Sequence, residues 1–347
     1  MRPTTESTLQ DVEKKPPRGV LRSEGLRPWL NPGIWLTLLV VLLVGLWPVI
    51  TGSASTREVI FTVFLSVVLA TSLNILLGYT GYVSFGHVVF FGLGGYVGLY
   101  LMSAHNTNLW LAMLAGGLAS GVLAFLLGKA ILRLRGAYFA LATIGINEAM
   151  RAFINIFTPF GGPTGLSLNF SVYKEYGGAA QALWFTYYVL VLLVLVGIVL
   201  SYGVKTSKFG LGLMAIREDE DAAEVMGVTT PNAKTWAYVL SALLPGMVGV
   251  LFFFKNGNVE PADAFRLQFS IETLVMIMLG GQGTVIGPVL GAAGYQRLRG
   301  FLLTNPTFKN YQLTLAGALL LLIILFIPAG VIGWLRNRIP GLRRILV

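Results

Sequence analysis

The chain contains no cysteine, only two histidines and few acidic residues. Without cysteine there is no disulfide framework, thiolate nucleophile or cysteine-ligated zinc site, and His87 and His105 are too few for a histidine-based metal site. The phosphate-binding pattern G-x-x-x-x-G-K-[S/T] and the hydrolase patterns H-E-x-x-H and G-x-S-x-G are also absent. We therefore expect no metal site, no bound cofactor and no enzymatic activity on this chain, and any use of ATP must take place on another chain.

Charged residues are scarce, at 12% of the chain, whereas hydrophobic residues make up 55%. Soluble domains carry about 25% charged residues, so the composition predicts a polytopic membrane protein. The net charge of +10 arises from basic residues at the ends of apolar segments, which indicates membrane topology rather than nucleic-acid binding. Glycine recurs with the spacing that lets membrane helices approach closely, at Gly94/Gly98, Gly117/Gly121 and Gly283/Gly287/Gly291.

Apolar segments of membrane-spanning length, about 20 residues, begin near Gly33, Val59, Asn108, Ala182, Lys234 and Tyr311. Two further spans, at 86–103 and 138–157, are interrupted, and residues 270–294 are broken by glycine and proline. These segments predict an all-α polytopic membrane protein with about eight to ten crossings. We expect the glycines of 280–283 and the Gly287-Pro288 pair to split one span into a re-entrant pair.

Lysine and arginine gather on the cytoplasmic side of membrane proteins. In this chain they lie in the first 31 residues and at 129–135, 205–208 and 336–344, whereas the loops at 158–181 and 255–269 carry few and balanced charges. This distribution predicts that both termini are cytoplasmic and that those two loops are external. The expected organisation is a disordered cytoplasmic tail at 1–31, a transmembrane domain at 32–335 and a basic cytoplasmic tail at 336–347.

The few acidic residues are concentrated in one segment. Five of the chain's 15 lie within seven positions: Glu218, Asp219, Glu220, Asp221 and Glu224. The apolar spacing around them, with Ala215, Ile216, Ala222, Ala223 and Met226 on one stripe, predicts a cytoplasmic helix at about 212–228 that ends at Gly227. We expect Arg217 and Asp221 to pair at i,i+4 and Glu220 and Glu224 to repel at the same spacing.

This acidic helix lies on the basic side of the protein, where anionic lipid headgroups would repel it. We therefore interpret it as a docking element for another protein, with a merely solvated helix face as the alternative.

A second feature is the break between two apolar spans in residues 77–96, which is rich in glycine and carries no strong charge. Irregular backbone at membrane depth is tolerated where it is buried in protein or lines a cavity. We predict that this segment lines part of a translocation path, with six candidate residues: Tyr79, Ser84, Gly86, His87, Gly92 and Gly94. The alternative is a tight turn at the membrane surface.

Two smaller features have less specific interpretations. The glycine cluster at 161–165 is a turn signal in the longest predicted external loop, and it could also form a gate or a docking edge. Glu148 and Arg151 lie at i,i+3 in an otherwise apolar stretch. Since charges at membrane depth are expected to pair, we interpret them as a structural ion pair near a membrane boundary rather than as a substrate site.

Six motifs occur in a fixed order, and together they resemble the permease subunits of branched-chain amino acid ABC importers of the LivM type. The resemblance covers roughly residues 33–335, and its motifs are L-G-Y-T-G at 77–81, S-F-G-H-V-V-F-F-G at 84–92, L-R-G-A-Y-F-A at 134–140, G-G-P-T-G at 161–165, the segment from F-G at 209–210 to 227, and L-G-G-Q-G-T at 279–284, followed by P-A-G at 328–330.

The resemblance implies a multi-pass protein of the bacterial inner membrane that works with several partners. These are a second related permease, two cytosolic ATPases that hold ATP and magnesium, and an external solute-binding protein. Residues 217–227 would be the coupling helix that is seated in the ATPase, and residues 84–95 would line the path at the interface with the second permease. A permease for urea or short amides shares these motifs, and an ion-driven secondary transporter is the alternative from another class.

Overall fold

The computed structural model describes residues 31–304, 314, 317–318, 321 and 330–338. In these residues six helices are long and apolar enough to cross a membrane: α1 (Pro32–Thr51), α2 (Ala54–Thr80), α3 (Val88–His105), α4 (Leu109–Ile131), α6 (Ala179–Thr206) and α9 (Thr230–Asn256). The predicted all-α polytopic fold is confirmed. The predicted terminal tails and the span predicted near Tyr311 lie largely outside the described residues.

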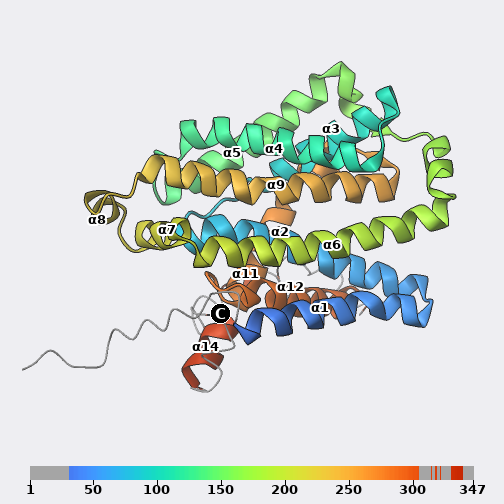
Figure 1. The fold of residues 1–347 in the computed structure, drawn as a ribbon. Helices are drawn as coiled ribbons and strands as arrows, with labels where there is room; N and C mark the ends of the chain where they lie inside the picture. The colour runs from blue at the N-terminus through green and yellow to red at the C-terminus, as the bar shows by residue number, and fades with distance from the viewer. Residues whose placement is uncertain (1–30, 305–313, 315–316, 319–320, 322–329, 339–347) are drawn as a thin grey trace, which may run out of the picture. The chain divides into compact units, whose positions relative to one another are not determined.

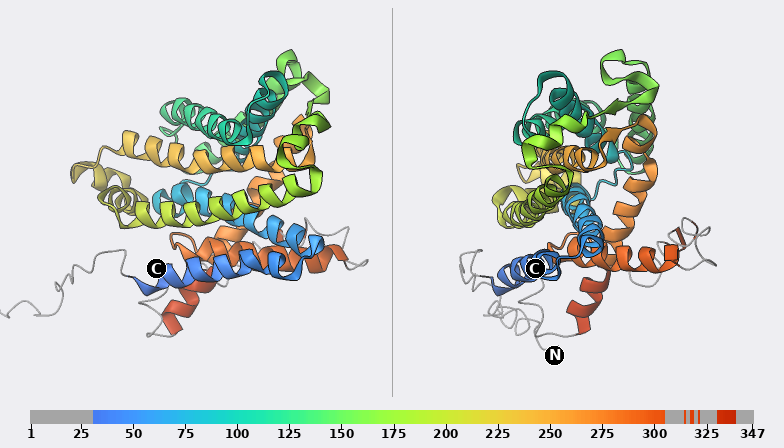
Figure 2. Two further views of the ribbon diagram at one scale, coloured as in Figure 1. Left: turned by 45° about the vertical axis from the view of Figure 1, so that its right-hand side comes forward. Right: turned by 90° about the vertical axis from the view of Figure 1, so that its right-hand side faces the viewer.

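The other described elements lie between and after these helices in the chain (Figure 1). They are α5 (Ala137–Ile156), α7 (Lys208–Glu218), α8 (Glu220–Val225), α10 (Pro261–Ala264), α11 (Leu267–Gly280), α12 (Ile286–Thr304), α14 (Gly330–Arg338), the 3-10 helices η2 (Thr158–Phe160), η3 (Gly162–Thr164) and η4 (Phe170–Tyr176), and the strands β1 (Leu166–Ser167) and β2 (Asn258–Val259). In both views of Figure 2, α3 and α4 lie on one side of α9, and α1 and α12 lie on the other.

The connections gather at two opposite ends of the long helices. At one end, α7 and α8 contact the end of α2 and the starts of α5 and α9, and Lys234 of α9 in turn contacts the end of α4. At the other end, β1 pairs with β2 in antiparallel register, with Leu166 opposite Val259. This pairing joins the two loops that were predicted to share the external side, and the basic connections at 129–135 and 205–208 lie at the other end.

Small residues bring α3, α4 and α9 into backbone contact. A side chain at Gly94 would clash with the backbone of Gly246 on α9, and one at Gly246 would clash with Ser120 on α4. Such close approach favours the association of helices in lipid. Lipid is itself apolar, so burying apolar side chains between helices does not stabilise their association, and close packing must do so. The glycine spacing that predicted close packing is therefore confirmed at these contacts.

The chain also breaks where the glycines of 280–283 predicted it. Helix α11 ends at Gly280, α12 begins at Ile286, and the two helices pack against each other, with the backbones of Gly280 and Gly287 in contact. Gly287 and Pro288 lie in the first turn of α12, where proline needs no backbone N–H, so this pair does not break the helix. At 14 residues, α11 is shorter than the roughly 20 that a full span needs.

The non-helical segment 81–87 is buried among helices rather than exposed as a surface turn. Its amide at Phe85 donates to the Thr143 hydroxyl of α5 at 3.1 Å, and the amide of Val88, the first residue of α3, donates to the Ser270 hydroxyl of α11 at 3.1 Å. Gly86 packs so closely on Thr143 that any side chain there would clash with its carbonyl. Side chains of two other helices thus supply the hydrogen bonds that this backbone cannot make for itself.

His87 meets a hydrogen-bonding need created by a proline. Pro245 lies inside α9 and has no N–H, so the carbonyl of Ser241, four residues earlier, has no partner within the helix. The Nε2 atom of His87 lies 2.9 Å from this carbonyl oxygen. Because a carbonyl only accepts, the proton must be on Nε2, which makes His87 a structural donor at this contact.

This arrangement predicts that His87 and Pro245 are energetically coupled. We expect His87→Leu to lower the free energy of unfolding by about 1–3 kcal/mol, because it leaves the Ser241 carbonyl buried without a donor. In a Pro245→Ala background the restored N–H can serve that carbonyl, so the same substitution should cost clearly less. Unfolding in detergent of the two single variants and the double variant measures the coupling. Equal losses in both backgrounds would contradict the explanation.

A candidate coupling segment and translocation groove

The predicted acidic helix is two helices in the structure. Asp219 adopts extended backbone, with φ −157° and ψ 114°, between α7 and α8. Its carboxylate accepts from the amides of Asp221 and Ala222 at 2.9 and 3.0 Å, so it caps the start of α8. The aspartate competes with a continuous helix in this way because its side chain satisfies the amides that a new helix start exposes.

The predicted end of this segment at Gly227 is confirmed. Gly227 has a φ of +88°, which favours glycine. Its amide donates to the carbonyl of Glu224, and the amide of Val228 donates to that of Ala223, both at 3.0 Å. These two bonds form a Schellman motif, the usual way in which a left-handed glycine closes a helix.

The predicted pairing of Arg217 with Asp221 is wrong, because the break at Asp219 turns the two side chains apart. Arg217 points inward, where its guanidinium donates to the carbonyl of Gly78 at the end of α2, at 2.8 Å. Gly283, in the turn between α11 and α12, packs against the same guanidinium. Arg217 therefore fastens α7 to two elements of the membrane region.

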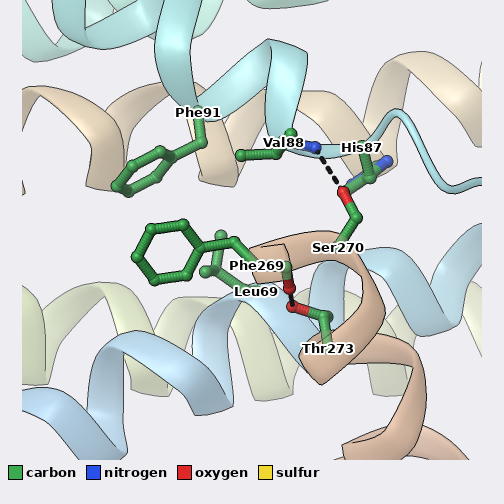
Figure 3. A pocket seen from close by; sticks show the side chains of 7 residues that line it. All are labelled: Leu69, His87, Val88, Phe91, Phe269, Ser270 and Thr273. Atoms are coloured by element: carbon green, nitrogen blue, oxygen red, sulfur yellow. Dashed lines mark hydrogen bonds between the residues drawn. The ribbon is translucent and has the colours of Figure 1, made fainter. Parts of the chain in front are cut away.

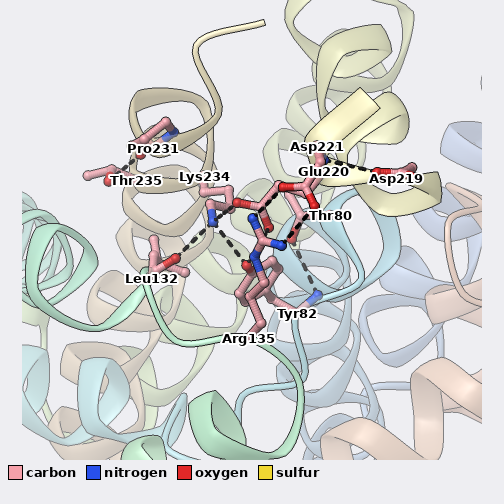
Figure 4. Close-up of polar contacts among 10 residues, drawn as sticks. All are labelled: Thr80, Tyr82, Leu132, Arg135, Asp219, Glu220, Asp221, Pro231, Lys234 and Thr235. Carbon is pink, nitrogen blue, oxygen red and sulfur yellow. Dashed lines mark hydrogen bonds and ion pairs between the residues drawn. The ribbon is translucent and has the colours of Figure 1, made fainter. Parts of the chain in front are cut away.

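Glu220 also points inward, into a buried cluster (Figure 4). Its carboxylate lies 2.6 Å from the ammonium of Lys234, a side chain that is only 3% exposed at the start of α9. The same ammonium donates to the Tyr82 hydroxyl at 2.9 Å and the Leu132 carbonyl at 2.8 Å, so all three of its protons are used. Tyr82 in turn donates to Glu220 at 2.8 Å. This cluster fastens α8 to α4, to α9 and to segment 81–87.

Tyr82 keeps its proton in this cluster. Its burial and, after that, its hydrogen bond to Glu220 raise the pKa of Tyr82. The hydroxyl therefore remains a donor to Glu220 while it accepts from Lys234.

Arg135 connects α8 to the start of α5. Its guanidinium forms two hydrogen bonds with the carboxylate of Asp221, at 2.8 and 3.3 Å, and its Nε lies 3.5 Å from Glu220. The hydrogen bonds from Arg135 hold the pKa of the Asp221 carboxyl below its usual range. Any stability from this charge is therefore present at neutral pH and lost only as the pH falls through the lowered pKa. Because the pair is exposed to solvent, its contribution to the free energy of unfolding is small. Its main effect is to link α8 to the start of α5.

The outward side of the segment combines acid with apolar surface. Glu218 and Glu224 are exposed, and Val225 and Met226 at the tip are 88% and 84% exposed. The predicted apolar stripe included Met226, but only Ile216 and Ala223 of that stripe are buried. Large apolar side chains that protrude beside acidic ones are typical of a protein-docking surface.

Two grooves lie beside this segment. One, of about 520 Å³, is lined by segment 80–85, by the start of α5 and by Ile216, Arg217 and Glu220. The other, of about 470 Å³, lies between the end of α4, α8 and the start of α9. Arg135 and Glu220 line both grooves. Part of the segment that was predicted to line a translocation path, at Tyr82, Val83 and Phe85, thus does border an open space.

The six candidate path residues themselves are buried. Tyr79 donates to the Ser201 carbonyl at 3.1 Å, Ser84 is fully buried, and Gly86, Gly92 and Gly94 fill close helix contacts. His87 borders a cavity of about 10 Å³ next to Phe91, Phe269 and Ser270 (Figure 3), which has room for about one water molecule. In this conformation these residues hold helices together, and their role in transport remains a prediction.

Three residues of the cluster were not singled out by the sequence. Arg135 is one of several basic residues at 129–135, Lys234 stands at the start of an apolar span, and Tyr82 lies in segment 77–96 without an assignment of its own. A lysine in the first turn of a long apolar helix is the one available signal, because a charge there requires a partner.

Six helices long and apolar enough to cross a membrane, a broken pair of helices at α11 and α12, and a segment of two short helices at one end of the bundle are consistent with a membrane permease component. The chain belongs to the family described as the branched-chain amino acid transport system permease component, whose model matches residues 55–324. It is therefore a multi-pass transport subunit of the bacterial inner-membrane type and not an enzyme.

Curated relatives agree with this assignment. The high-affinity branched-chain amino acid transport system permease protein LivM of Escherichia coli strain K12 is 28% identical over 329 residues, which cover 88% of this chain and 76% of the relative. LivH of the same strain is 22% identical, over 76% of this chain and 90% of its own. A probable LivM of Methanocaldococcus jannaschii is 26% identical, over 76% and 89%. Similarity to both LivM and LivH implies a second permease subunit. No solved structure matches this chain.

The buried cluster predicts that Lys234 is required for the position of α8. Removal of one partner of a buried ion pair costs about 3–5 kcal/mol; because Glu220 keeps Tyr82 and Arg135, we expect Lys234→Met to fall at the lower end. Hydrogen exchange at the amides of α8 should become faster, and unfolding should occur at a lower temperature. Lys208→Met, which removes an exposed lysine from α7, is the matched control and should change neither. Unaltered exchange in α8 after Lys234→Met would refute the role.

Proposed function

We propose that this chain is one of two permease subunits of an ATP-driven importer that carries branched-chain amino acids into the cell. The single observation that supports this most is the similarity to LivM along most of both chains. The geometry adds a physical reason, because a segment fastened inward by Arg217, Glu220 and Lys234 presents its opposite side to a partner.

In this proposal two cytosolic ATPases bind and hydrolyse ATP with magnesium, and this chain holds neither. The end of the molecule that carries α7 and α8 is cytoplasmic, as are both termini. The tip of α8, with Glu218, Glu224, Val225 and Met226, is seated in a groove of one ATPase. Movement of α8 reaches α5 through Arg135, whose contacts with Asp221 and Glu220 are the direct connection between the two helices.

An external solute-binding protein would deliver the solute at the opposite end. The pair of β1 and β2 and the glycine cluster at 161–165 lie there, on the connections that follow α5 and α9. The solute then passes along the face that this chain shares with the second permease, and the groove beside segment 80–85 is its opening to the cytoplasm.

A permease for urea or short amides is the second candidate, because it shares the sequence motifs. An ion-driven transporter is less well supported, since the protruding tip of α8 would then have no partner.

Uptake by cells with and without this gene distinguishes the substrates. We expect deletion to reduce uptake of labelled leucine, measured with urea in parallel, and the intact gene to restore it. Loss of urea uptake alone would replace the proposed substrate and keep the architecture. Leucine uptake that collapses with an uncoupler, but persists when ATP is depleted, would contradict the ATP-driven mechanism.

The outward side of α8 predicts where the ATPase binds. We expect the double variant Glu218→Lys and Glu224→Lys to release the ATPase in co-purification and to abolish uptake, because it reverses the charge of the proposed docking surface while the inward cluster remains intact. Met226→Asp should weaken binding for a different reason, the loss of an apolar contact. Glu175→Lys, on an exposed acid at the other end of the molecule, is the control. Undiminished co-purification of both α8 variants would disprove this docking site.

A further inference from the structure

Helix α5 is buried on one side only. Its buried positions are Phe139, Thr143, Asn147 and Ile154, which lie on one stripe. The opposite stripe is exposed at helical spacing and comprises Tyr138, Leu141, Gly145, Glu148, Ala152 and Ile156. A side chain built at Gly145 would meet no atom within 4 Å. Most of this helix therefore faces away from the rest of the chain.

The exposed side of α5 carries an ion pair. Glu148 and Arg151 lie 3.5 Å apart, with side chains 55% and 44% exposed. One end of α5 lies beside α8, where Arg135 contacts Asp221, and the other leads to Gly165, which packs on Val259 of β2. The pair therefore lies between the two ends of the long helices.

Lipid is an unsuitable neighbour for this face. A charged side chain at the centre of a bilayer costs about 2.5–3.5 kcal/mol even on the lowest scales. The exposed faces of α1 and α4 carry instead leucine, valine and tryptophan, which are side chains that suit contact with lipid. By contrast, Glu272 and Arg299, an ion pair of α11 and α12, are only 4% and 24% exposed. The exposed pair on α5 must therefore face water or protein.

The adjoining segment supports the same conclusion. Asp263 and Arg266 form a second ion pair on either side of Phe265, the residue whose carbonyl binds α5, and both side chains are about half exposed. Two exposed ion pairs therefore lie on neighbouring elements, one on α5 and one in the segment that α5 contacts. Exposed charges of both signs suit the wall of an aqueous path.

We propose that Glu148 and Arg151 form a recognition site for a zwitterionic amino acid in the translocation path. The carboxylate of Glu148 would accept hydrogen bonds from the α-ammonium group of the solute, and the guanidinium of Arg151 would bind its α-carboxylate with two donors. Gly145 lies one turn before Glu148 on the exposed side of the helix and leaves room for the solute. Between passages the two side chains neutralise each other, as they do in the structure.

This site rests on the proposed function and goes beyond it, because it assigns the recognition of the solute's charged groups to two residues. Urea has neither an ammonium nor a carboxylate group, so the site also favours amino acids over the second candidate substrate.

The test uses the complete importer, assembled with its partner subunits in liposomes that enclose ATP, with leucine-loaded binding protein outside at saturation. We expect Glu148→Gln and Arg151→Gln each to reduce leucine uptake at least tenfold while the complex still assembles, and Arg151→Lys to retain more uptake than Arg151→Gln. Lys174→Gln and Glu175→Gln, exposed charges of the external loop, are controls that should transport normally.

A charge-swapped double variant, Glu148→Arg with Arg151→Glu, separates recognition from simple pairing. It preserves the ion pair, so a purely structural role predicts full recovery of uptake, whereas oriented recognition predicts continued impairment. Full recovery, normal uptake by both glutamine variants, or failure of those variants to assemble would each overturn the site. If the unmodified importer carries no leucine at all, the proposed function itself fails, and with it the basis for the site.

Discussion

Backbone groups inside a membrane must find hydrogen-bond partners within the protein, and much of this structure depends on how segment 81–87 meets that requirement. The segment has no helix to satisfy its amides, so hydroxyls from α5 and α11 do so at Phe85 and Val88. In the same place His87 supplies the donor that Pro245 withholds from α9. Three helices, α5, α9 and α11, are thereby held together at one short stretch of irregular chain.

The same stretch begins beside α8, because Tyr82 donates a hydrogen bond to Glu220. Tyr82 is part of the buried cluster with Glu220 and Lys234, and the backbone continues from it to His87 at the middle of α9. A displacement at α8 therefore has a short covalent route to the membrane interior, in addition to the route through Arg135 to α5. The first route is the covalent backbone and the second is an ion pair, so neither consists of apolar contacts.

Much of the fold could be predicted from the sequence because membrane helices have a strong and simple signal. Apolar length predicted the spans, and the glycines at 280–283 predicted the break after α11. The helical character of the acidic segment was predicted from its apolar spacing, and its end at Gly227 from glycine chemistry.

What could not be predicted is the direction in which side chains point. The capping of α8 by Asp219 depends on a local competition between helix and cap, and it turns Arg217 and Glu220 inward while Met226 protrudes. The inward partners of Glu220 are separated from it by between 14 and 138 residues, so no local pattern indicates them. The ion pair of Glu148 and Arg151 was predicted from its spacing and is present, but its exposure depends on which side of α5 the rest of the chain covers.

Arg135 and Glu220 also have a consequence for the shape of the end that carries α7 and α8. Both residues line the groove of about 520 Å³ and the groove of about 470 Å³, and Nε of Arg135 lies 3.5 Å from Glu220. Separating the two side chains would join the grooves into one vestibule. If α8 moves α5 through this contact, as we propose, the same displacement would also open the connection between the two spaces.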